Sequence, residues 1–229
     1  MLASPLEPAV QAQAWQCTAP NILPRPRAEY AKPADIRRTP ISGYILALSW
    51  SPEYCRTRKN DSKSALQCSG SMGDFGFVLH GLWPEASGPN YPQWCKKAPV
   101  ISRETVRKNI CMTPDVQLLQ HEWAKHGTCM TQKADSYFDA ARTLYGAINF
   151  PDMARLSHDK NLNALKIADA FEMENDDLPA NAVKVQTNRK SWVEEVRICM
   201  DTKFMPTKCP NFVRGAAPNE RVKIWRTLP

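Results

Sequence analysis

The sequence predicts one domain in which β-strands and α-helices combine and disulfide bonds hold the fold together. Short runs rich in branched and aromatic residues, at 43–50 and 77–79, suit buried strands. Residues 135–148 and 161–173 instead repeat apolar residues at helical spacing. Eight cysteines in 229 residues is a high and even number, which favours four disulfides in an oxidising compartment.

Composition excludes a membrane-embedded protein. The chain is 43% hydrophobic and 9% aromatic, as is ordinary for a globular domain, and no apolar run approaches the length of a membrane span. Residues 1–8 lack the basic start and apolar run of a signal peptide, so we interpret the sequence as a mature or trimmed chain of a periplasmic or secreted protein. We also expect the protein to be a monomer that does not contact a membrane.

The net charge of +7 is unevenly distributed. Residues 180–229 contain ten basic and four acidic side chains and therefore hold most of the excess. A basic surface favours a polyanionic partner through charge neutralisation, although a role in solubility alone would give the same composition.

The N-terminal residues 1–40 are predicted to form a separate arm. They are rich in proline and have few apolar runs, which is typical of chain without regular structure. Cys17 is expected to join this arm to the body, because a free thiol in a secreted arm would be open to oxidation. Residues 41–229 are predicted to form the single folded domain.

The two strand segments are expected to end in different ways. Residues 43–50 are mostly apolar and suit the middle of a sheet covered on both faces, and Pro52 ends that strand. Residues 77–79 form a second buried strand, which Gly81 is expected to end by letting the backbone turn. His80 then lies at a strand terminus, where a hydrogen-bonded core histidine and a catalyst are equally compatible with the sequence.

Further elements are predicted from local patterns. Ser102 is a suitable N-cap for a short helix over 102–111. Residues 181–186 and 192–200 alternate apolar and polar residues around a turn, which predicts a hairpin.

The densest group of ionisable residues lies at 118–129. Two leucines are followed by two histidines, a glutamate and a lysine within six residues. At about 100° per residue, a helix places all four within an arc of about 140° and puts the leucines one turn earlier on the same side. Such a face borders a core that opens into a cleft, where titrating groups do chemistry. The four are His121, Glu122, Lys125 and His126.

Two other interpretations of this helix remain open. A solvated turn could carry a Glu122 and His126 pair, but leucines in register with the charges argue against an exposed face. A zinc site of the zincin type needs histidines at i and i+4, whereas His121 and His126 stand at i and i+5. We therefore predict no metal site and identify Gly127 as the end of the helix.

Residues 77–84 (FVLHGLWP) and 121–129 (HEWAKHGTC) together resemble the two signature segments of the ribonuclease T2 family. Residues 44–55 (YILALSWSPEYC) resemble the family's first core strand and the loop cysteine after it. The signatures are specific, they occur in the expected order, and the resemblance extends loosely from about residue 43 to Cys209. The first forty residues lie outside it.

The resemblance implies an α+β fold, with a mainly antiparallel β-sheet packed by several α-helices, and makes 41–229 a ribonuclease T2-like catalytic domain. It implies endonucleolytic cleavage of single-stranded RNA without metal or other cofactor. It also suggests three disulfides and leaves two cysteines, which we pair with each other. The pairs are Cys55 with Cys68, Cys95 with Cys129, Cys199 with Cys209, and Cys17 with Cys111.

The residues present suit that chemistry. RNA cleaves itself when a 2′-oxygen attacks the adjacent phosphorus, which requires a base, an acid and charge stabilisation. Histidine, with a reference pKa of about 6.5, can serve as both base and acid. The resemblance makes His126 the base and His80 the acid, although the sequence is equally compatible with the reverse. Lys125 would neutralise the growing charge, His121 would hold the phosphate, and Glu122 would orient or charge a neighbouring histidine.

The first product is expected to be a 2′,3′-cyclic phosphate, and DNA, which lacks the attacking hydroxyl, should survive. Trp83 is a candidate platform for a base, with core filling as its alternative, and Glu85 could accept from an exocyclic amino group. A catalytically silent polyanion binder on the same fold, or a metallohydrolase, would be alternative functions.

Overall fold

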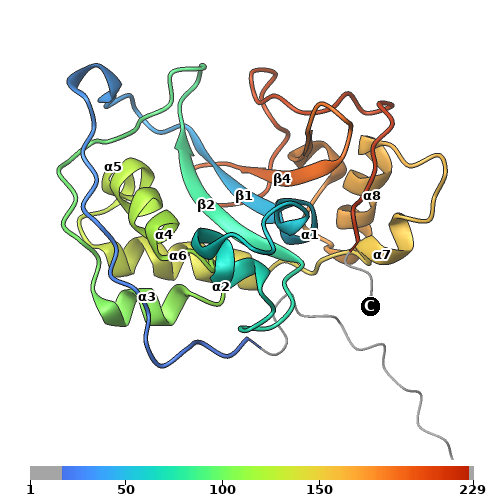
Figure 1. The fold of residues 1–229 in the computed structure, drawn as a ribbon. Coiled ribbons are helices and arrows are strands. Elements are labelled where there is room, and N and C mark those ends of the chain that lie inside the picture. Colours follow the sequence, from blue (N-terminus) through green and yellow to red (C-terminus); the bar gives the residue numbers. More distant parts are fainter. Residues whose placement is uncertain (1–16, 227–229) are drawn as a thin grey trace, which may run out of the picture.

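A computed structural model describes residues 17–226, and a four-stranded antiparallel sheet lies at its centre (Figure 1). The strands follow the spatial order β2-β1-β4-β3, so the first strand is central. Their pairing and the helices around them confirm the predicted α+β class. The strands are β1 (Gly43–Trp50), β2 (Phe77–Glu85), β3 (Val183–Thr187) and β4 (Val193–Met200).

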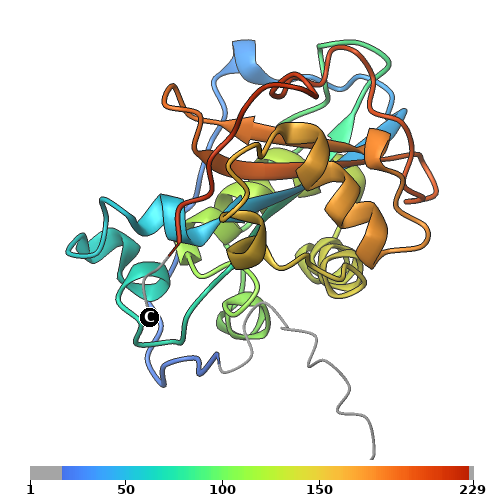
Figure 2. The ribbon, with the colours of Figure 1, turned by 90° about the vertical axis from the view of Figure 1, so that its right-hand side faces the viewer.

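In Figure 1, α3 to α6 lie beside β2, and α7 and α8 lie beyond β4. Residues of α3, α4, α6, α7 and α8 pack in one main core on the same face of the sheet. Viewed after the quarter turn of Figure 2, α8 lies across the β3 and β4 hairpin. The α-helices are α1 (Ser51–Cys55), α2 (Ala65–Cys68), α3 (Arg103–Asn109), α4 (Val116–Glu122), α5 (Thr128–Met130), α6 (Ala134–Gly146), α7 (Met153–Leu156) and α8 (Ala164–Glu174). The short 3-10 turns are η1 (Pro33–Asp35), η2 (Ser62–Ser64) and η4 (Ala180–Ala182), and η3 (Trp123–Gly127) is a π-helical turn.

Strand β1 is buried on both faces, as its apolar run predicts. Leu46 and Leu48 are fully buried in the main core beneath the helices. Ile45 and Ala47, on the opposite face, pack in a smaller cluster with Cys199. Because both faces are covered, this strand is a rigid central support for its two neighbours.

Side-chain caps fix where two of the helices begin. The Ser102 hydroxyl accepts from the Thr105 amide, which confirms it as the N-cap of α3. Asp115 performs the same function for α4, accepting from the amides of Gln117 and Leu118 at 2.8 and 2.9 Å. Capping satisfies amides that lack partners within the helix, so the start of α4 is well defined.

Four disulfides join all eight cysteines, which lie within the described residues. Cys17–Cys111 spans 94 residues and ties the segment before β1 to the end of α3, whereas the other three bridges close shorter loops. Those bridges are Cys55–Cys68, Cys95–Cys129 and Cys199–Cys209.

His80 does not lie at a strand terminus, so that prediction was wrong. Strand β2 continues to Glu85, and its register against β1 shifts between the pairs Ala47 with Gly81 and Leu48 with Leu79. His80 is thus the extra residue of a β-bulge, a feature that redirects a side chain without ending the strand.

Gly127 does not end the helix either. The chain continues from α4 through the π-helical turn η3 into α5 without a break. A Cβ atom at Gly127 would lie 2.5 Å from the Trp123 ring and 2.8 Å from Tyr137. This glycine therefore permits close packing on α6.

Of the helices in residues 17–226, none has the length and apolar character needed to cross a bilayer. The predicted division into an arm (1–40) and a domain (41–229) stays a prediction, and residues 1–16 of that arm lie outside the described residues.

Candidate active site

The two signature segments meet at one pocket. Strand β2 contributes three side chains to a cavity of about 300 Å³, and the α4–η3 helix contributes four. All seven residues proposed from the sequence as catalytic or base-binding therefore line the same space. They are His80, Trp83, Glu85, His121, Glu122, Lys125 and His126, and the lining is completed by Ile45, Tyr91 and Arg197.

The π-helical turn explains how both histidines of the helix reach this pocket. His121 and His126 are five residues apart, a spacing that an ideal α-helix turns away from a single line. A π-turn closes i→i+5 and winds more residues into each turn, so positions five apart approach the same side. Such turns are frequent at functional sites.

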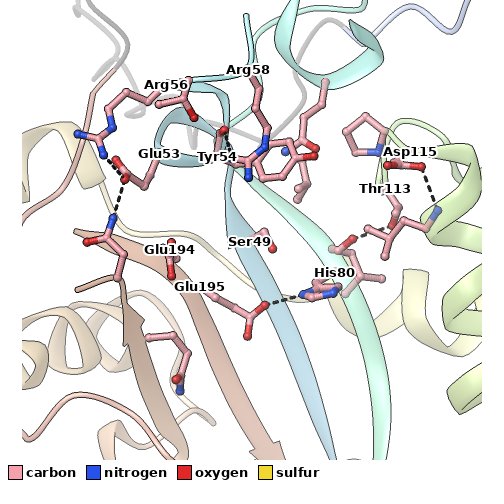
Figure 3. Close-up of a pocket in the computed structure, with 18 of the residues that line it drawn as sticks. Ser49, Glu53, Tyr54, Arg56, Arg58, His80, Thr113, Asp115, Glu194 and Glu195 are labelled. Carbon is pink, nitrogen blue, oxygen red and sulfur yellow. Dashed lines mark hydrogen bonds and ion pairs between the residues drawn. The ribbon is translucent and has the colours of Figure 1, made fainter. Parts of the chain in front are cut away.

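His80 reaches across the central strand to a partner on β4. Its Nδ1 lies 2.6 Å from Oε2 of Glu195 (Figure 3). The residues of β1 that lie between the two strands are Ala47 and Ser49, and both have small side chains. Ala47 pairs with Gly81 of β2, and Ser49 pairs with Glu195 of β4. The bulge at His80 and the small residues of β1 together allow a hydrogen bond between two strands that are not neighbours.

The charges around His80 stabilise its protonated form. Burial alone lowers the pKa of His80, but the hydrogen bond to Glu195 and the negative charges of Glu122 and Glu195 outweigh burial and raise it. Burial would raise the pKa of Glu195, yet His80 and Arg197 lower it overall. Arg197 holds the other oxygen of Glu195 through a 2.7 Å bond from Nε. A charged imidazole is therefore favoured at this position.

Glu122, the last residue of α4, connects this helix to β2 through a hydrogen bond. It is 3% exposed, its Oε2 accepts from the Trp83 indole N–H at 2.7 Å, and its Oε1 lies 3.8 Å from His80 Nε2. Burial raises the pKa of Glu122, and the neighbouring His80 and His121 only partly offset this. Glu122 thus fixes the indole ring and adds negative charge beside His80 when ionised.

Gly81 is required because Glu122 lies directly against the strand. A Cβ atom at Gly81 would lie 1.9 Å from Glu122 Oε2 and 2.5 Å from Trp83 Nε1. Glycine in a strand marks such a close approach.

A Gly81→Ala variant is therefore expected to displace Glu122 and Trp83 and to lose about 1–3 kcal/mol of unfolding free energy, the usual cost of overpacking. Denaturant unfolding measures the loss. Gly88→Ala is the matched control, since a Cβ there meets nothing within 4 Å. Equal stability of the two variants would contradict this role of Gly81.

His126 is a buried residue of the pocket, and its surroundings shift its pKa in the direction opposite to that of His80. It is only 3% exposed, and the rings of Trp83 and Tyr91 lie nearly parallel to it, with centroids 5.5 and 6.0 Å away. Its Nδ1 has no hydrogen-bond partner among the described residues. Burial, together with the nearby positive charges of Lys125 and the other histidines, lowers its pKa well below the usual histidine value. A neutral imidazole, able to accept a proton, is favoured here.

His121 is held from outside the pocket. Its Nδ1 lies 2.7 Å from Oε2 of Glu29, a residue of the N-terminal segment, and Trp94 meets its ring edge-on at 5.5 Å. Since Nδ1 is engaged, Nε2 is the nitrogen left to face a ligand. Lys125 lines the pocket one turn further along.

Trp83 and Glu85 lie on the β2 side of the pocket. The Arg197 guanidinium lies over the Trp83 ring, 5.2 Å from its centroid, a cation–π contact that fixes the ring further. Burial raises the pKa of Glu85 to about 7, although the charge of Arg197 opposes the shift. Glu85 can therefore donate a hydrogen bond when neutral and accept one when ionised.

A larger groove of about 690 Å³ lies on the far side of His80. Figure 3 shows Tyr54, Arg58 and Asp115 along its rim, with His80 and Glu195 at its floor. His80 lines both the groove and the pocket, so a bound chain could pass from one to the other over this imidazole.

Sequence reasoning missed four residues of the site. Glu195 and Arg197 stand two apart on β4 and so share one face, while Val196 and Ile198 face the core. The alternation along the strand shows that Glu195 and Arg197 share one face, but it does not show which site that face borders. Tyr91 and Glu29 belong to irregular segments, and no local pattern marks either of them.

The described part of the chain contains no group of three or more histidine, cysteine, aspartate or glutamate side chains arranged to hold a metal ion.

Comparison with known proteins matches residues 42–209 to the model of the ribonuclease T2 family. A probable ribonuclease of Haemophilus influenzae is 31% identical over an alignment of 183 residues that covers 75% of this chain and 62% of that protein. A ribonuclease of Aeromonas hydrophila is 42% identical over 89 residues, 38% of this chain and 36% of that protein. The matches thus span less than two thirds of either relative.

Among solved structures, an RNase-related protein from Calystegia sepium superposes with a TM-score of 0.61 at 22% identity. The match covers 78% of this chain and 95% of that one. At this identity the likeness concerns the fold.

Proposed function

Because this chain belongs to the ribonuclease T2 family, we propose that it is an endoribonuclease that cleaves single-stranded RNA by transesterification through the 2′-hydroxyl, without a metal ion. One observation carries the proposal: two histidines line the same pocket, and their surroundings move their pKa values in opposite directions. Environments that separate two pKa values in this way assign one group as acid and the other as base.

In the proposed reaction His126 takes the proton from the 2′-hydroxyl, since a buried imidazole with a lowered pKa is neutral and free to accept. The 2′-oxygen then attacks phosphorus. As the bond from phosphorus to the 5′-oxygen breaks, protonated His80 donates its proton to that oxygen. The products are a 2′,3′-cyclic phosphate and a 5′-hydroxyl, and attack of water on the cyclic product, with the proton transfers reversed, gives a 3′-phosphate.

The remaining ionisable residues stabilise the phosphorane. Lys125 supplies positive charge for the non-bridging oxygens, and Nε2 of His121, when protonated, holds a phosphate oxygen. Glu122 and Glu195 keep His80 charged, and Glu195 also orients its ring. Preorganised charges of this kind cost no rearrangement as the transition state forms.

We propose that the part of the Trp83 ring left exposed beside His126 and Arg197 is the platform for a base, and that Glu85 contacts the edge of that base. Trp83 is partly exposed in the pocket and is fixed by Glu122 and Arg197, so its orientation is set before a base arrives. Glu85 would accept from an exocyclic amino group when ionised, above a pH of about 7.

All the residues that line the pocket belong to one chain, and we propose a monomeric enzyme. Four disulfides favour an oxidising compartment, and we propose the periplasm or the exterior of the cell.

Incubation with RNA and with DNA in the presence of a chelator tests the proposal. We expect RNA alone to be cut and to carry 2′,3′-cyclic phosphate ends, because DNA lacks the attacking hydroxyl. Chelator-sensitive turnover would instead indicate a metallohydrolase. Binding of RNA without turnover would indicate a catalytically silent polyanion binder, for which the basic residues 180–229 would be the working surface.

A further inference from the structure

The N-terminal segment 17–42 lies almost entirely outside the residues that match the family model, yet it touches the active-site helix directly. In Figure 1 it runs as an extended trace past α5, α4 and α3. It has little regular structure, with a single 3-10 turn, η1. The segment is therefore held in place by its contacts with the rest of the protein, and not by regular secondary structure of its own.

Both oxygens of Glu29 are engaged by one face of α4. Oε2 lies 2.7 Å from His121 Nδ1, and Oε1 accepts from Gln117 Nε2 at 2.6 Å. Gln117 and His121 are four residues apart, so they lie one turn apart on the same side of the helix. Gln117 is itself fixed, because its side-chain oxygen accepts from the Arg27 amide and its nitrogen donates to the Arg27 carbonyl.

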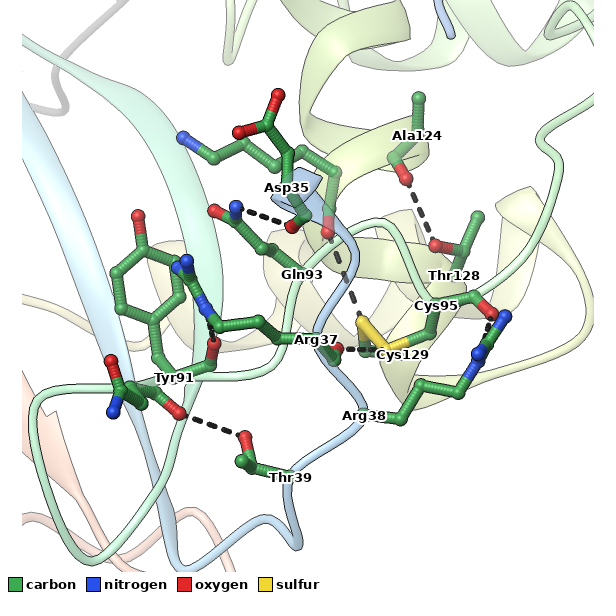
Figure 4. Close-up of a disulfide and its surroundings, with 12 residues drawn as sticks. Asp35, Arg37, Arg38, Thr39, Tyr91, Gln93, Cys95, Ala124, Thr128 and Cys129 are labelled. Carbon is green, nitrogen blue, oxygen red and sulfur yellow. Dashed lines mark hydrogen bonds between the residues drawn. A yellow bond between two sulfur atoms is a disulfide. The ribbon is translucent and has the colours of Figure 1, made fainter. Parts of the chain in front are cut away.

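The segment is anchored on both sides of Glu29. On one side the Cys17–Cys111 disulfide ties it to the end of α3. On the other, the backbone of Arg37 exchanges two 3.0 Å hydrogen bonds with Gln93, beside the Cys95–Cys129 disulfide (Figure 4). A chain fixed at two points loses little further freedom when Glu29 binds between them.

Trp94 completes the surroundings of His121 from the body of the protein. It meets the His121 ring edge-on, and its backbone has a φ of 56°, which a bulky residue rarely adopts. The Trp94 amide donates to the Lys125 carbonyl at 2.7 Å, which holds this conformation against the helix. Backbone strain of this kind clusters at functional sites.

We propose that Glu29 is a positioning residue for His121. The carboxylate accepts from Nδ1–H, which fixes the ring orientation and presents Nε2 to the phosphate. This inference rests on the proposed function, in which His121 contacts substrate, and it gives the segment before the family domain a part in catalysis.

The test compares Glu29→Gln with Asp35→Asn, the control that removes an exposed carboxylate of the same segment that does not line the pocket. Loss of a charge-assisted hydrogen bond should lower kcat/KM on a ribodinucleotide by about 10- to 100-fold. Asp35→Asn should match the wild type, and both variants should keep its melting temperature.

A double-mutant cycle separates positioning from general structural support. In a His121→Gln background, Glu29→Gln should cause no further loss, whereas a purely structural role would lower activity in both backgrounds alike. An equal loss in the two backgrounds, or wild-type activity of Glu29→Gln, would overturn the inference.

A readout independent of activity distinguishes failure of this inference from failure of the proposed function. Long-range ¹H–¹⁵N NMR of the wild-type His121 ring should show a proton on Nδ1 that Glu29→Gln alters. A bare Nδ1 in an enzyme that cleaves RNA would overturn the role of Glu29 alone. Absence of RNA cleavage by the wild type, with Nδ1 protonated, would overturn the proposed function while leaving the contact in place.

Discussion

Replacing either His80 or His126 by phenylalanine is expected to lower kcat on RNA by about 10²–10⁴, the contribution typical of a general acid or base. Phenylalanine keeps the planar shape of the side chain and removes the proton-transferring nitrogens. At His126 the fold should tolerate the change well, since Nδ1 has no partner to lose among the described residues and the neighbouring rings can pack on phenylalanine. Initial rates on a ribodinucleotide measure the effect.

His158→Phe is the matched control for both variants. This histidine is exposed and contacts Arg226, away from the pocket, so its replacement should leave kcat unchanged. Melting temperatures establish that all three variants are folded. Rates of His80→Phe or His126→Phe close to that of His158→Phe would exclude the affected histidine from proton transfer.

The pH dependence of kcat/KM is expected to be bell-shaped, with its limbs on either side of the ordinary histidine pKa of about 6.5. The base must be neutral, so activity rises with pH through the lowered pKa of His126. The acid must be protonated, so activity falls as pH rises through the raised pKa of His80. Measurement in a Glu85→Gln background keeps the ionisation of that carboxyl, near pH 7, out of the profile.

A Glu195→Gln variant should move the alkaline limb to lower pH and leave the acid limb in place. The hydrogen bond and the negative charge of Glu195 raise the pKa of His80. Once they are gone, burial and Arg197 lower it, and only the charge of Glu122 opposes them. Glu194→Gln is the control, because the adjacent Glu194 is exposed and is not among the charges that shift the pKa of His80. An unchanged alkaline limb in Glu195→Gln would mean that this limb does not report His80.

Local patterns predicted most of the elements and the helix that carries the site. Residues 118–129 combine an apolar side with clustered ionisable groups, and both features lie within one helix, where spacing along the chain determines direction in space. The hairpin of β3 and β4 was predictable for the same reason.

The partners of the histidines were not predictable, because they depend on long-range pairing. His80 and Glu195 are 115 residues apart and meet only because β1 separates their strands and carries small side chains between them. His121 and Glu29 are 92 residues apart, and one of them belongs to a segment without periodicity. The bulge at His80 was equally hidden, since its register shift arises only once β2 is paired.

The same two groups titrate whichever histidine is the acid, so the assignment of roles needs a chemical test. A ribodinucleotide with sulfur in place of the 5′-bridging oxygen provides it, because a thiolate leaves without protonation. If His80 is the acid and His126 the base, the sulfur substrate should restore turnover to His80→Phe and leave His126→Phe inactive. Restored turnover in His126→Phe, with none in His80→Phe, would contradict the assignment.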